Sequence, residues 1–108
     1  MTLFEMIAES GINPDNIAHI CFTSAVEPPY CTVINRNPNV ITADGEVVEI
    51  IEKLAVELYC EPSDETTHLA LEQVFNNHKI CYNVQCTYLG ADEYLNMWIY
   101  TFDKKEDY

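Results

Sequence analysis

The chain has few basic residues: five Lys and Arg stand against eighteen Asp and Glu, which leaves a formal net charge of -13 at pH 7. This charge repels nucleic-acid phosphates and anionic membrane surfaces, so we expect no sequence-specific binding of nucleic acid. No apolar run approaches the roughly 20 residues of a membrane helix. The opening MTLFEMIAES carries acids where a secretory signal carries bases. These absences predict a soluble protein that contacts no membrane and stays in the compartment where it is made.

Motifs of common metal and cofactor sites are also missing. The three glycines are scattered at predicted turns, so there is no Gly-rich phosphate loop. His68 and His78 are too far apart to form the i, i+4 pair that binds zinc on a helix. Cys81 and Cys86 have an odd separation on a predicted strand, so their side chains face opposite sides and cannot share a metal ion. We predict no metal site and no cofactor.

The cysteines are odd in number and irregularly spaced, and none forms a C-x-x-C pair. This pattern favours buried, reduced thiols in a cytosolic protein. His19 and Cys21 lie two apart on a predicted strand and so share a face, as a nucleophile and its base would. No third residue identifies itself as an orienting group. We therefore predict a half-buried strand pair at this position and a protein that is not an enzyme.

The sequence is long and apolar enough for one hydrophobic core. Its 108 residues fall in the usual range of a single domain, and 48% of them are hydrophobic. We expect one domain over residues 1–108. The charged C-terminal segment DKKEDY, residues 103–108, is predicted to fray.

The stretch from Ala43 to Glu61 predicts a long strand rather than a helix. Its Glu, Lys, Leu and Ala content suits a helix, but apolar residues recur at every second position. This row is Val48, Ile50, Leu54, Val56, Leu58 and Cys60, and only Glu52 interrupts it. The intervening row is largely polar, which is typical of a strand with one wet face.

The remaining elements follow from caps, turns and periodicity. Thr2 and Glu5 match a capping box, which predicts a helix over about 3–10. A second helix is predicted over about 64–77, with Ser63 or Asp64 as its cap. Further strands are expected near 17–22, 30–36, 40–42, 80–88 and 94–102. A loop is predicted over 35–39, a turn at Asp44-Gly45, and a short connection over 89–93. The fold class is therefore α+β, a mostly antiparallel sheet of four to five strands with the two helices packed against one face or edge.

Several aromatic and loop residues are candidates for contact with other subunits. Aromatic side chains crowd one face of the last predicted strand, and such a cluster marks either a core or a partner surface. The two loops around residues 27–29 and 36–39 are further candidates. The predicted partner or subunit interface consists of Glu27, Pro28, Pro29, Tyr30, Arg36, Asn37, Tyr94, Trp98 and Tyr100.

The order of several motifs resembles the small tail-completion, tail-terminator or head-to-tail joining proteins of long-tailed phages. The succession is PPYCTVI, ITADGEVV, VELYCEPSDE, a short helix ending near NNHKICY, and the hairpin CTYLGADEYLNMWIYTF. Pro29-Tyr30, Ala43-Asp44 and Glu57-Leu58-Tyr59 carry the resemblance, which covers about residues 17–102. The sequence departs from the family pattern at Ile51 and Lys53, where more aromatic or basic character is expected.

The resemblance implies a structural virion protein without catalysis. Such proteins look like tail terminators, which form a ring, commonly a hexamer, that caps the tail-tube protein and docks to the head connector protein. The location implied is the head-tail interface of the virion, and the host cytoplasm during assembly. Six copies at -13 each carry -78 formally, and acidic walls around the lumen would let DNA pass without sticking.

A second interpretation of the negative charge belongs to another class. A compact acidic viral protein could mimic DNA and inhibit a nucleic-acid-binding enzyme, because carboxylates can replace phosphates at a basic groove. This alternative predicts a monomer or dimer with acids in rows on one surface. The tail interpretation instead predicts ring assembly and a surface with apolar patches.

Overall fold

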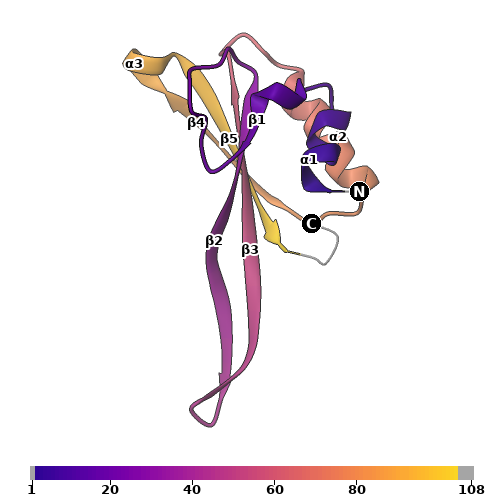
Figure 1. Ribbon diagram of the computed structural model, residues 1–108, viewed down its shortest axis with the longest axis vertical. Coiled ribbons are helices and arrows are strands. Elements are labelled where there is room, and N and C mark those ends of the chain that lie inside the picture. Colours follow the sequence, from indigo (N-terminus) through magenta and orange to yellow (C-terminus); the bar gives the residue numbers. More distant parts are fainter. Residues whose placement is uncertain (1, 105–108) are drawn as a thin grey trace.

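A computed structural model describes residues 2–104, with the side chains of 36–43, 47–51 and 91–92 left out of the description (Figure 1). The protein is an α+β domain with one five-stranded mixed sheet, as predicted. In chain order the elements are α1 (Leu3–Glu9), a 3-10 turn (Pro14–Asn16), β1 (Ile17–His19), β2 (Tyr30–Ala43), β3 (Glu46–Cys60), α2 (Thr67–Asn77), β4 (Asn83–Leu89), α3 (Gly90–Glu93) and β5 (Leu95–Asp103).

The sheet has the strand order β1-β2-β3-β5-β4. All neighbours are antiparallel except β1 and β2, which run parallel. The long predicted strand is confirmed as β3, which spans Glu46–Cys60 and pairs with both β2 and β5. Asp44 and Gly45 both have positive φ, at 53° and 80°, and join β2 to β3. Positive φ at both turn residues matches the right-handed twist of a hairpin, which is why Asp-Gly is favoured there.

The predicted loop over 35–39 is wrong. β2 continues through it to Ala43, and only the pairing register shifts between Arg36 and Asn39. A bulge can place an extra residue, even a proline, within a strand without ending it. The result is a two-stranded arm, residues 36–52, that projects from the body (Figure 1).

Helices α1 and α2 lie on the same side of the sheet and pack against each other (Figure 1). The apolar row predicted for β3 is confirmed where side chains are described, since Leu54, Val56, Leu58 and Cys60 are all buried. The other row is less wet than predicted, because Ala55 is also fully buried. The core is completed by α1, α2 and the facing residues of β2 and β5. It consists of Leu3, Met6, Ile7, Ile12, Ile17, Cys31, Val33, Leu54, Val56, Leu58, Cys60, Leu71, Val74, Phe75, Ile80, Tyr100 and Phe102.

The first helix begins as the sequence predicts. The Thr2 side chain accepts a hydrogen bond from the Glu5 N–H, and the Glu5 carboxylate accepts one from the Thr2 N–H. These two bonds satisfy donors that have no partner within the helix. Gly11 follows the end of α1 with a φ of 106°, a backbone conformation that residues other than glycine rarely adopt.

Several predicted boundaries are shifted. β1 ends at His19, not near 22, and Ile20 has a positive φ of 74°. The connection over 89–93 forms a helical turn, α3, and Tyr94 closes it in the left-handed conformation. Asp103 belongs to β5, and the Lys104 N–H donates to the Glu52 carbonyl at 2.8 Å, so the chain is held to residue 104. The rest of the predicted frayed tail lies outside the described residues.

The second helix starts at Thr67 rather than near 64, and Asp64 orders its first turn. One carboxylate oxygen accepts from the N–H groups of Thr66 and Thr67, both at 3.0 Å, and the other accepts from the Thr67 hydroxyl at 2.5 Å. Burial disfavours the charged form, but these hydrogen bonds outweigh it and hold the pKa of Asp64 below its ordinary value of 3.8. Asp64 therefore stabilises the folded state as a carboxylate.

We expect Asp64→Asn to destabilise the protein by about 1 kcal/mol at pH 7, because a neutral amide oxygen accepts weaker hydrogen bonds than the charged carboxylate. Because the pKa is lowered on folding, the contribution is fully present above 3.8 and is lost as pH falls through the folded-state value. Urea unfolding midpoints of the two proteins should therefore differ at pH 7 and approach each other as the pH is lowered below 3.8. The neighbouring Glu65→Gln removes the same charge from an exposed side chain and is the control. Equal effects of the two substitutions would contradict the assignment.

Candidate functional site

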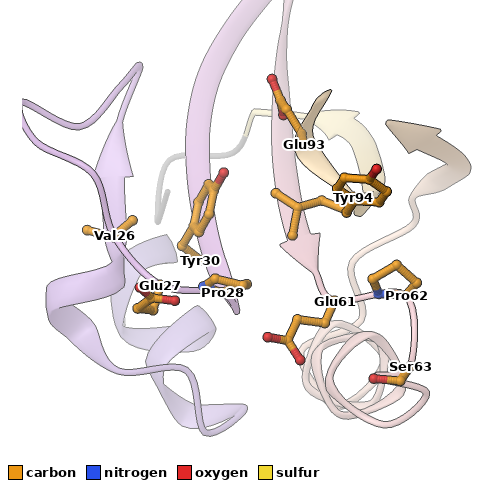
Figure 2. A pocket seen from close by; sticks show the side chains of 10 residues that line it. Val26, Glu27, Pro28, Tyr30, Glu61, Pro62, Ser63, Glu93 and Tyr94 are labelled. Carbon is orange, nitrogen blue, oxygen red and sulfur yellow. The ribbon is translucent and has the colours of Figure 1, made fainter. Parts of the chain in front are cut away.

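A pocket of about 410 Å³ lies at the end of the sheet opposite the arm (Figure 2). Three separate segments form it: the loop before β2, the turn after β3, and the junction of α3 with β5. They meet because β3 pairs with both β2 and β5, so Tyr30 is opposite Tyr59 and Cys60 is opposite Asn96. The lining residues are Val26, Glu27, Pro28, Tyr30, Glu61, Pro62, Ser63, Glu93, Tyr94 and Leu95.

The loop that enters β2 is tied to the body of the protein. The Asn16 side chain donates to the carbonyls of Glu27 and Pro29, at 3.1 and 3.2 Å. Asn16 ends the 3-10 turn before β1, and β1 pairs with the first residues of β2. The same side chain therefore fixes the position of Glu27 and Pro28 on the pocket wall.

Tyr30 is held between two other aromatic rings. It stacks on Tyr59 with ring centroids 4.8 Å apart and meets the edge of Phe22 at 5.6 Å. Stacked and edge-on pairs of this kind add to the stability gained by burial alone. Tyr30 therefore forms a preorganised wall, whereas Tyr94 stands largely exposed at the rim (Figure 2).

The pocket is negative. Glu27, Glu61 and Glu93 line it and are all exposed. Burial, and next the charge of Glu93, raise the pKa of Tyr30, because a second negative charge beside a carboxylate is unfavourable. Among the residues whose side chains are described, the ion pairs Lys53–Asp103, His78–Glu9 and Lys104–Glu52 use none of these three carboxylates. The pocket therefore suits a basic or hydrogen-bond-donating group of a partner.

Four of the predicted interface residues are brought together here. Glu27, Pro28, Tyr30 and Tyr94 line the pocket, although Tyr94 is far from the others in sequence. Pro29 lies beside it and offers its carbonyl to Asn16. The side chains of the predicted Arg36 and Asn37 lie outside the described residues.

The other two predicted residues face the helices. Tyr100 is fully buried, so its assignment to a partner interface is wrong. Its hydroxyl donates to the Glu72 carboxylate on α2 at 3.0 Å, and its ring packs on Phe75. Trp98 is partly buried against the core, with its ring stacked on His68 at 3.9 Å. The aromatic face of the last strand is thus mainly a core face.

Sequence reasoning missed the wall formed by Glu61, Pro62, Ser63 and Glu93. The sequence places Glu61 at the end of the long predicted strand, Pro62 and Ser63 at the start of a helix, and Glu93 in a connection. The pairing of β3 with β5, which skips over α2 and β4, brings them together. No local motif signals such a non-local pairing.

The pair considered as a nucleophile and its base, His19 and Cys21, does not lie on one strand, because β1 ends at His19. Both side chains are exposed, so the prediction of a half-buried strand pair is wrong. In the described part of the chain no three His, Cys, Asp or Glu side chains are grouped closely enough to hold a metal ion. Among the described residues no helix is long and apolar enough to cross a bilayer.

No protein-family model matches the chain, and the curated proteins contain no significant match to it.

Proposed function

We propose that this protein is a structural subunit of the tail of a long-tailed phage, which assembles into a ring that completes the tail tube and joins it to the head connector. The order of motifs from Pro29-Tyr30 to Glu57-Leu58-Tyr59 supports this family, and the α+β sheet is compatible with it. The observation that carries the proposal is the arm, residues 36–52, because in the described part of the chain it consists of β2 and β3 paired only with each other.

The arm extends the molecule to 51 Å along its longest axis, against 31 and 25 Å along the others. Among the described residues, the part of β3 on the arm side of Lys53 pairs with β2 alone, since β5 ends at Asp103 opposite Lys53. An isolated two-stranded hairpin is at best marginally stable in water. Packing against neighbouring subunits would supply the missing layer, as in a ring of identical chains.

The pocket supplies a second contact of the proposed assembly. Its ring of Glu27, Glu61 and Glu93 around Tyr30 suits a basic side chain, because both carboxylates and aromatic faces attract cations. The described chain has few bases to fill this pocket from another copy. We therefore assign the pocket to the tail-tube or connector partner and the arm to contacts between copies.

The negative charge sets the conditions under which rings form. Copies at -13 each repel one another, and salt screens such repulsion between exposed charges. We expect rings of more than two copies, seen by negative-stain electron microscopy and native mass spectrometry, to become more abundant with added salt and protein. The lumen of the ring should be acidic.

A variant without the arm tests its role in ring assembly. In the pairing of β2 with β3, Arg36 is directly opposite Lys53. Replacing residues 37–52 with Asn-Gly therefore closes the hairpin in a two-residue turn and removes the arm. The shortened chain should keep its core, checked by circular dichroism, but form no rings. Rings without the arm would contradict its role. A chain that never exceeds two copies, and binds a DNA-processing enzyme, would instead support the DNA-mimic alternative.

A further inference from the structure

Strand β4 forms one free edge of the sheet. In the order β1-β2-β3-β5-β4 it pairs with β5 alone. Six of its seven residues are exposed, and Val84 and Tyr88 retain 40% and 54% of their accessible surface. An edge strand presents a row of backbone N–H and C=O groups that can pair with another strand. β4 is therefore exposed both along its edge and on the side-chain face that carries Val84 and Tyr88.

This edge lacks the usual protection against pairing. Natural edges are commonly guarded by charged side chains or proline. Residues 80–91 contain none of these and form the longest stretch of the sequence without Asp, Glu, Lys or Arg. In a chain of net charge -13, two copies that meet along this stretch bring none of its side chains into like-charge contact.

The side chains of β4 complement themselves in an antiparallel arrangement. A two-fold axis at the central Cys86 would pair all seven residues and place Val84 opposite Tyr88 of the second copy, twice. Alternate residues share a face, so both pairs lie on the same side of the sheet. Pairs of an aromatic and a β-branched residue are among the favourable cross-strand contacts.

The opposite edge of the sheet is a poorer partner for β4. β1 is only three residues long, Ile17–His19, and the positive φ of Ile20 ends it. Pairing with β1 would leave most of β4 without a partner.

We propose that β4 pairs with β4 of a second copy of this chain, antiparallel and centred on Cys86. The contact joins the two sheets into one continuous ten-stranded sheet, because each contributes five strands. A two-fold contact closes on itself with two copies, so it is separate from the contacts that would build a ring. It goes beyond the proposed function and does not depend on it.

Cysteine cross-linking tests the register. Directly opposed residues have Cα atoms about 4.5 to 5.5 Å apart, within the range that a disulfide spans. The variant Cys21→Ser/Cys81→Ser keeps Cys86 as the exposed thiol, since Cys31 and Cys60 are buried. Diamide, which accepts the two hydrogens of the thiols, should convert most of it to a disulfide-linked dimer. The matched variant Cys21→Ser/Cys86→Ser keeps Cys81 exposed outside the strand and should stay monomeric on non-reducing gels.

A charged side chain introduced on β4 tests the contact without a covalent cross-link. Val84→Lys should weaken dimerisation at least tenfold in sedimentation equilibrium, because two lysines would be forced beside Tyr88 of the opposite copy. Leu69→Lys makes the same charge change on the exposed surface of α2 and should leave the dimer unchanged.

Three results would overturn the proposal. They are equal cross-linking through Cys81 and Cys86, unchanged dimerisation of Val84→Lys, and a Cys21–Cys86 cross-link in Cys81→Ser, which would show pairing of β4 with the β1 edge. A Cys86 cross-link in a protein that forms no rings would support the dimer and contradict the proposed function, so the two ideas fail separately.

Discussion

Leu71→Ala is expected to destabilise the protein by about 2 to 5 kcal/mol, the cost of removing a fully buried leucine and leaving a cavity. Leu71 lies on the face of α2 that packs into the core and has no accessible surface. Domains of this size are stable by only about 5 to 15 kcal/mol, so the loss is a large part of the total. Urea unfolding should show a much lower midpoint at an unchanged slope.

Leu69 supplies a control on the same helix. It is two residues away, and 57% of its surface is accessible. Leu69→Ala makes the same chemical change outside the core and should alter stability by no more than about 0.5 kcal/mol. If both substitutions cost the same, α2 packs on the sheet through a different face from the one described here.

Native-state labelling of thiols should divide the five cysteines into two groups. Cys21, Cys81 and Cys86 are exposed, whereas Cys31 and Cys60 are buried, so the prediction that the cysteines are buried is wrong for three of them. Ellman's reagent should label three thiols quickly. The other two should react at least about a thousandfold more slowly, since they become accessible only when the core opens.

The pKa values of the buried thiols add to their protection. Burial is the main cause that raises the pKa of Cys31 well above its ordinary value and that of Cys60 to about 12. The thiolate is the reactive form, so raising the pH to about 9 should not expose these two to reaction. All five should react in urea, and Cys86→Ser should lower the fast count to two. Five fast thiols in the native protein would contradict the described core.

The local sequence predicted the elements whose signals lie within a few residues. The alternation from Leu54 to Cys60 predicts a strand with a buried apolar row, and both the strand and this row are confirmed. Thr2 with Glu5 and the Asp44-Gly45 turn are likewise confirmed. Each depends on hydrogen bonds or backbone dihedrals of neighbouring residues, so the chain needs no distant contact to define it.

Predictions failed where a local preference competed with pairing. Proline and asparagine around residue 38 favour a loop, but the strand continues because β3 is long enough to pair on both sides of the bulge. Tyr100 could belong equally to a core or a surface by its alternation alone. The position of α2 over β5 makes Tyr100 a core residue, because Phe75 packs on its ring and the Glu72 carboxylate accepts a hydrogen bond from its hydroxyl.

The sequence by itself determined the acidic character, the strand periodicity, the helix caps and the hairpin turn, because these depend on composition and on contacts between near neighbours. Only the tertiary structure decided the strand order, the pocket and the exposed edge at β4. These depend on β5 pairing with β3 rather than only with its neighbour in the chain. Such a pairing is chosen by how the whole core packs, and no short segment carries that information.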